Sequence, residues 1–334
     1  MWKLFATTMT LTLTLLTPAY VVAQETPGSQ KSLAEQLVDA FNAVFGVHPG
    51  VRANHPKGVV LEGQFTPSAS ATSLTKAAHL QKRKTPIPVT VRFSAGSGLP
   101  TVPDTNEMPR GMAVKFSLPD GTKTDLVVLS YNGFPVATGE EFRDFLLAIA
   151  ASGPDAPKPT EFEKFLSAHP AAKAFVESPK PPPVSYATLP YFGINAFKFT
   201  NAKGMATHVR YQLQPVAGAQ YLPKDQVSTK GPDYLTTEIR ERVGHGPVKF
   251  KLLAQVAEKN DKIDDPTIAW PDTRKKVELG TITITKTVAD STAAEKKLLF
   301  VPGALVPGIE AADPMIAARS AAYIVSLSRR AQAQ

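Results

Sequence analysis

Cysteine is absent from all 334 residues, and this absence excludes several kinds of chemistry at once. Without a thiol the chain has no disulfide framework, no thiolate nucleophile, no cysteine-bound zinc and no iron–sulfur cluster. The six histidines, at positions 48, 55, 79, 169, 208 and 245, include no pair at the helical spacing of zinc ligands. Any metal or cofactor is therefore expected on oxygen or nitrogen ligands.

Several functional signatures are also lacking. No run of five or more basic residues occurs, although the formal net charge is +8, so nothing indicates nucleic-acid binding. The short cluster Lys82–Lys84 is typical of a solvated loop. Gly96-Ser97-Gly98 matches neither phosphate-binding fingerprint, and no G-x-S-x-G elbow is found. The positive charge can still attract anionic ligands, including cofactors that bear carboxylates.

The composition is that of a globular protein with proline-rich loops. Hydrophobic residues make up 43% of the chain, and there are 30 prolines and 21 glycines. This apolar content is enough to build a core, and the length allows one large domain or two ordinary ones.

The N-terminus has the layout of an export signal. A positive start, Met1-Trp2-Lys3, precedes an uncharged stretch from Leu4 to Ala23 that ends in small residues. Threonines and Pro18 make this stretch a poor membrane anchor. We expect residues 1–23 to be a signal peptide, residues 24–334 to be the mature protein in the periplasm or secreted, and no membrane anchor after cleavage.

The mature chain alternates between helical and strand patterns. A capping box at Ser32 begins an amphipathic helix that Gly46 ends. Runs of period two fill residues 48–133, and two further capping boxes, Thr138–Glu141 and Thr160–Glu163, begin helices. Strands resume after the proline-rich 180–183, and Asp313-Pro314 begins a last helix. Strands are expected at 196–199, 207–213, 248–256 and 278–286.

About eight strands in two sets of four, separated by helices, favour an α+β fold. We predict an antiparallel eight-stranded β-barrel with flanking helices.

A series of motifs resembles the haem catalase family in order and spacing. They cover roughly residues 45–330. They are Arg52–Gly58 with Gly63 and Phe65, Val91–Ser94, Asp104-Thr105, Pro109–Phe116, Asp120-Gly121, Asp125–Val127, Asp265–Thr267, Trp270-Pro271, Val306–Glu310, Arg319 and Tyr323. We expect the fold to be without the long N-terminal arm and C-terminal helical domain of full catalases. The resemblance is therefore closest to the small catalase-related peroxidase branch and implies a single haem-binding domain over 24–334, as a monomer or small homo-oligomer.

The resemblance places Tyr323 at the position of the iron ligand. A phenol binds iron as phenolate when a positive charge stabilises the anion, and Arg319, four residues earlier on the same helix, can supply it. Without the resemblance, ordinary packing of Tyr323 in an amphipathic helix would be the better interpretation.

The resemblance also assigns the remaining site residues. His55 falls at the distal position, where a neutral imidazole can move the proton of a peroxide, and Ser94 matches the hydroxyl that orients it. The expected cofactor-binding residues are Arg319 beside the iron ligand, three arginines for the haem propionates and one aromatic residue: Arg52, Arg92, Arg330 and Phe142.

One departure bears on the activity. Where catalases carry a distal asparagine after Asp-Leu-Val-Gly, this chain has Val128-Leu129-Ser130, and the nearest amide, Asn132, comes three positions late. This departure favours a peroxidase with weak or no catalase activity.

The sequence therefore predicts an exported haem peroxidase. It would use haem b (iron protoporphyrin IX) and reduce hydrogen peroxide or organic peroxides with a small organic electron donor. The alternatives are a catalase-like fatty-acid hydroperoxide isomerase or dehydratase and a non-catalytic periplasmic haem-binding protein.

Overall fold

The structure, a computed structural model, describes residues 30–333. Residues from Ser32 onward form one compact unit. The predicted signal peptide, residues 1–23, lies outside the described residues. Within those residues, no helix combines the length and apolar character needed to span a membrane.

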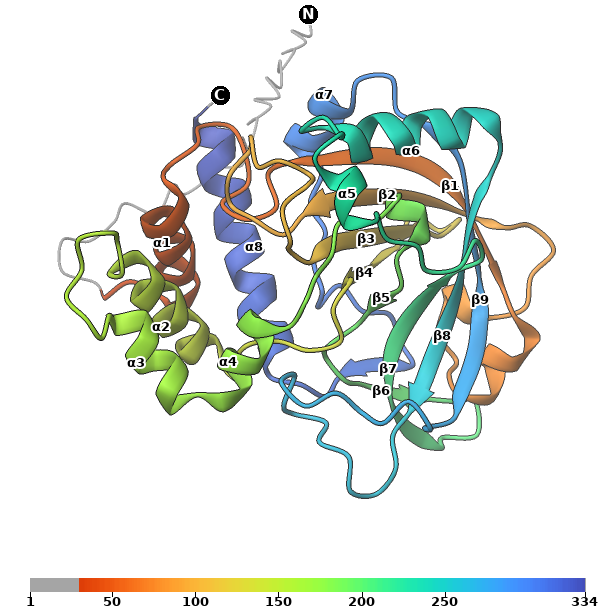
Figure 1. Cartoon of the computed structure of the whole chain (residues 1–334). Helices are drawn as coiled ribbons and strands as arrows, with labels where there is room; N and C mark the ends of the chain where they lie inside the picture. The colour runs from red at the N-terminus through yellow and green to blue at the C-terminus, as the bar shows by residue number, and fades with distance from the viewer. Residues whose placement is uncertain (1–29, 334) are drawn as a thin grey trace, which may run out of the picture. The chain divides into compact units, whose positions relative to one another are not determined.

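A closed antiparallel β-barrel of eight strands forms the centre of the fold, as the sequence pattern predicted (Figure 1). The hydrogen-bonded order is β10-β6-β7-β5-β4-β3-β2-β1-β9-β8, and pairing of β7 with β8 closes the ring. The short strands β5 and β6 both pair with β7, and β10 extends the sheet beside β6. The strands are β1 (Gly58–Pro67), β2 (Ile87–Ala95), β3 (Arg110–Ser117), β4 (Lys123–Leu129), β5 (Tyr191–Phe192), β6 (Phe197–Thr200), β7 (Ala206–Pro215), β8 (Val248–Val256), β9 (Lys276–Thr287) and β10 (Ile309–Ala311).

Aromatic and branched side chains fill the barrel. Phe93 stacks on Tyr186 with ring centroids 5.1 Å apart, and Phe65 meets Phe116 edge to face at the same distance. Phe250 is also fully buried in this core. On β2 the interior residues alternate with Arg92 and Ser94, which therefore face the other side of the sheet.

The helices cover the outside of the barrel. α1, α2, α3 and α4 gather on one side, and α8 runs between that group and the barrel, whereas α6 crosses another part of the barrel surface (Figure 1). The helices are α1 (Leu33–Phe45), α2 (Gly139–Ala150), α3 (Glu161–Ala168), α4 (Pro170–Glu177), α5 (Lys224–Val227), α6 (Tyr234–His245), α7 (Ser291–Lys297) and α8 (Met315–Gln332).

The three predicted capping boxes are all present. The side chains of Ser32, Thr138 and Thr160 each accept a hydrogen bond from a backbone N–H at the start of a helix. In each case the side chain of a glutamate three residues later accepts from the backbone N–H of the capping residue. These helices share a second apolar core outside the barrel, in which Phe142 packs against Phe134 and Phe41 at centroid distances of 4.8 and 5.7 Å. The space between this core and the barrel is where the predicted site residues lie.

Candidate active site

A large cavity lies where β2, β3 and β4 face α8, α1 and α2. Its empty space is about 1150 Å³, open mouth included. Most of its lining is apolar, and the polar side chains are concentrated in the loop before β1, on β2 and on α8. All eight predicted site residues line it: Arg52, His55, Arg92, Ser94, Phe142, Arg319, Tyr323 and Arg330.

The backbone of His55 is held in an unusual conformation. Its φ of +56° lies in the left-handed region, which costs a non-glycine residue about 1–3 kcal/mol. The His55 N–H donates to the carbonyl of Ser97 at 2.8 Å and to the Asn54 side chain at 3.0 Å. The His55 carbonyl accepts from Arg92 Nη2 at 2.8 Å. These three hydrogen bonds hold the strained residue in place and direct its ring to the cavity.

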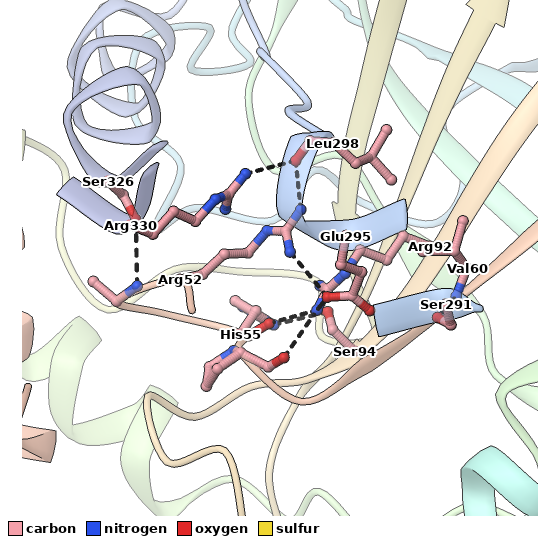
Figure 2. Close-up of polar contacts among 12 residues, drawn as sticks. Arg52, His55, Val60, Arg92, Ser94, Ser291, Glu295, Leu298, Ser326 and Arg330 are labelled. Carbon is pink, nitrogen blue, oxygen red and sulfur yellow. Dashed lines mark hydrogen bonds and ion pairs between the residues drawn. The ribbon is translucent and has the colours of Figure 1, made fainter. Parts of the chain in front are cut away.

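The ring of His55 is fixed through one nitrogen. Nδ1 lies 3.0 Å from Ser94 Oγ (Figure 2), which leaves Nε2 for the cavity that the ring lines. Gly111 makes this approach possible, because a Cβ there would lie 2.6 Å from Ser94 Oγ and 3.1 Å from His55 Nδ1. Burial, followed by the charges of Arg92 and Arg319, lowers the pKa of His55 to about 3. The imidazole is therefore neutral at pH 7 and can accept a proton.

Tyr323 reaches the same cavity from α8. Residues at helical spacing present one face of α8 to the cavity: Met315, Arg319, Ala322, Tyr323, Ser326 and Arg330. Arg319 Nη2 donates to the Tyr323 phenolic oxygen at 3.3 Å. The backbone N–H of Ala53 donates to Ser326 Oγ at 3.3 Å, which ties α8 to the loop that carries His55 (Figure 2).

Two buried residues, Asn195 and Asp313, fix the Arg319 guanidinium, and no sequence pattern predicted this role. Arg319 Nη1 donates to Asn195 Oδ1, and Asn195 Nδ2 donates to Asp313 Oδ2 at 2.7 Å. Burial raises the pKa of the Asp313 carboxyl, although the bond from Asn195 opposes this shift. Asp313 was predicted only as the start of the last helix, where its Oδ1 does accept from the Met315 N–H. Its second contact needs Asn195, which lies 118 residues earlier.

Arg52, Arg92 and Arg330 form the arginine cluster at one end of the cavity (Figure 2). One carboxylate bridges two of its members, because Glu295 accepts from Arg52 at 2.9 Å and from Arg92 at 2.8 Å. The Leu298 carbonyl accepts from Arg52 and Arg330 at 2.6 and 2.7 Å. Sequence reasoning found the three arginines and missed Glu295.

The arginine cluster carries more positive charge than its partners neutralise. Burial, then the charges of Arg92 and Arg330, lower the pKa of Arg52 to about 8. The buried Nε atoms of Arg92 and Arg330 have no hydrogen-bond partner in the part of the chain that the structure describes. Such a cluster is suited to an anionic ligand with planar acceptor groups.

Asn132 is the amide nearest in sequence to the position at which catalases carry an asparagine. It is not among the cavity-lining residues, so it does not supply an amide there. Leu129 lines the cavity instead. The one side-chain amide in the described lining belongs to Asn54, whose Oδ1 accepts from the His55 N–H. Among residues 30–333 no group of three or more histidine, aspartate or glutamate side chains is placed to hold a metal ion.

Comparisons with known proteins point to one family. The family model described as Catalase matches residues 49–333. A catalase-related peroxidase of Mycolicibacterium paratuberculosis is 36% identical over 300 residues, which are 89% of this chain and 94% of that protein. A catalase-related peroxidase of Synechococcus elongatus is 34% identical over 301 residues, covering 89% and 88%. In fold, the crystal structure of a fungal catalase matches with a TM-score of 0.75 at 22% identity, over 84% of this chain and 59% of that one.

The buried neutral state of His55 should make folding sensitive to acid. An unfolded histidine has a pKa of about 6.5, so above that pH both states are neutral and His55 contributes no pH dependence. Between pH 6.5 and 3 the unfolded chain binds a proton that the folded chain does not. The free energy of unfolding should then fall by about 1.4 kcal/mol per pH unit on account of His55.

Urea unfolding of wild type and His55→Gln between pH 6.5 and 5 measures this slope, which should be shallower in the variant by that amount. His79→Gln is the positive control. Burial also lowers the pKa of His79, which lies away from the cavity, to about 3, so this variant should show a shallower slope as well. A change of slope in His79→Gln with none in His55→Gln would contradict the assignment of a buried, neutral His55.

Proposed function

The chain belongs to the catalase family, and from that membership we propose that it is a haem b peroxidase that reduces peroxides with a small organic electron donor. The observation that carries the proposal is the meeting of three features at one cavity. These are the neutral imidazole of His55, which Ser94 orients, the phenol of Tyr323 beside Arg319, and the buried arginine cluster with its excess positive charge.

The residues present fit the haem that the family implies. Haem b carries two carboxylates. The arginine cluster has three positive charges against the single carboxylate of Glu295, which leaves a charge of +2 for those two groups. The unpaired Nε atoms of Arg92 and Arg330 offer further donors, and the apolar remainder of the cavity suits a porphyrin ring. Arg52, Arg92 and Arg330 would hold the carboxylates, and Phe142 would contribute to the apolar wall.

Tyr323 would hold the iron through its phenolic oxygen. An anionic phenolate requires a compensating charge, and Arg319 donates directly to that oxygen. Asn195 and Asp313 fix the other side of the Arg319 guanidinium, so its orientation toward Tyr323 does not depend on solvent. Haem bound here supplies the redox-active iron that exchanges electrons with peroxide and donor.

His55 moves the proton. In the reaction, a peroxide ROOH takes up two electrons and two protons, the O–O bond breaks, and ROH and water leave. The neutral Nε2 of His55 accepts the proton from one peroxide oxygen and returns it to the departing oxygen, while Ser94 holds the ring through Nδ1. The electrons come from the organic donor.

The cavity wall favours peroxidase over catalase activity. Leu129 presents an apolar side chain where catalases carry the distal amide, so a second hydrogen peroxide lacks that donor for its oxidation. The single reduction of a peroxide by the donor requires the proton transfer by His55 and does not require that amide. We therefore expect oxygen evolution from hydrogen peroxide to be weak beside donor-dependent turnover.

His55→Ala tests the proton-transfer role. The variant should retain haem. Its rate of peroxide-dependent oxidation of a chromogenic donor should be lower than that of wild type by about 100-fold or more, because it lacks the acid–base group. The measurement is steady-state donor oxidation, with the absorption spectrum as the check on haem content.

An unchanged rate in His55→Ala would refute the assignment of His55. Two results with wild-type protein would favour the alternatives. Consumption of a fatty-acid hydroperoxide without donor would support an isomerase or dehydratase, and haem binding without any peroxide turnover would support a haem carrier.

We further propose that the protein is exported, on the evidence of the positively charged start, the uncharged stretch and the small residues before Gln24. The mature protein recovered from the periplasm or the medium should begin at Gln24. Intact-mass measurement decides this, and a full-length chain confined to the cytoplasm would contradict it.

A further inference from the structure

Glu295 on α7 is a largely buried carboxylate beside the cavity, and the mechanism above gives it no role. Its carboxylate is only 14% exposed and pairs with both Arg52 and Arg92 (Figure 2). The short helix that carries it is attached to the barrel close by, because Ser291 Oγ accepts from the Val60 N–H at 2.9 Å. The next turn of chain provides the Leu298 carbonyl for Arg52 and Arg330. One short segment therefore supplies both acceptors of the arginine cluster.

The net charge of the arginine cluster depends on Glu295. Three guanidiniums within one buried cluster repel one another, and Glu295 is the one carboxylate that the described structure pairs with them. With Glu295 ionised the cluster has a charge of +2. With a neutral residue at that position it would have a charge of +3, with the same three arginines.

We propose that Glu295 is a positioning residue that takes the place of a ligand carboxylate in the empty protein: it holds Arg52 and Arg92 until the cofactor arrives, and its charge then lowers the affinity of the arginine cluster for a dicarboxylate. This inference rests on the proposed function, because it assumes that a porphyrin carboxylate binds the arginine cluster. Glu295 acts through the arginines and is not a catalytic residue.

Coulomb interactions in the empty and in the loaded protein determine whether the Glu295 charge raises or lowers the affinity for a dicarboxylate. In the empty protein Glu295 attracts the arginines and stabilises the cluster. In the loaded protein Glu295 and the ligand carboxylates compete for the same guanidiniums and repel one another. Removal of the Glu295 charge therefore destabilises the empty state and favours the loaded one, and both changes raise the affinity for a dicarboxylate.

Glu295→Gln tests this with a probe that has no iron. Metal-free protoporphyrin IX reports the carboxylate contribution without the Tyr323–iron bond, and its dimethyl ester has the same ring without the charges. We expect the variant to bind the dicarboxylate with a Kd about 10-fold lower than wild type, and the diester with an unchanged Kd. Porphyrin absorbance titration measures both constants, and circular dichroism of the empty protein checks folding.

Three further variants separate charge from structure. Glu295→Asp retains the charge and should keep the wild-type ratio of the two dissociation constants. Glu310→Gln removes an exposed carboxylate that pairs with Lys198 and should also keep it. Glu295→Ser removes the charge differently and should reproduce the sign of Glu295→Gln, which keeps the test available if that variant does not fold.

The outcomes distinguish the two proposals. An unchanged or weaker affinity of Glu295→Gln for the dicarboxylate, or an equal change for both porphyrins, would overturn the role of Glu295 and leave the proposed function standing. If wild type binds neither porphyrin nor haem, the proposed function fails and this inference fails with it.

Discussion

The alternation of side chains along β2 is the constraint on which the barrel and the site both depend. Val91 and Phe93 face the barrel interior, whereas Arg92 and Ser94, one residue out of step, face the cavity. A shift of register by one residue would expose the interior residues and bury the polar ones in the barrel core. The apolar packing of the barrel therefore also fixes Arg92 and Ser94, the two side chains on this strand that hold His55.

Much of the cavity is arranged against the preferences of isolated groups, and contacts from several elements sustain that arrangement. His55 has a left-handed backbone that three hydrogen bonds hold, and its imidazole is too buried to be charged at pH 7. Three arginines lie together with one carboxylate. Both features cost free energy in an empty protein, and both would serve the proposed function, in which a dianionic porphyrin binds and a peroxide proton is moved. Such local strain is typical of functional sites.

The sequence predicted the parts of this structure that local pattern determines. Period-two runs identified the strands, the capping boxes located three helix starts, and the resemblance supplied eight side chains that do share one cavity. The missed residues have their meaning only in three dimensions. Glu295 meets Arg52 across 243 residues of chain, and α7 has no pattern beyond a short polar turn. Asn195 and the left-handed backbone of His55 are likewise set by tertiary contacts.

The central claim is that Tyr323 holds the iron of a haem in the cavity that His55 lines. Resonance Raman and absorption spectra of the ferric haem-loaded protein, recorded beside those of Tyr323→Phe, test it most directly. The account predicts an iron–phenolate vibration and charge-transfer band in wild type, and their loss in the variant, which removes only the ligand oxygen. Identical spectra from the two proteins would show that another group holds the iron and would contradict the account.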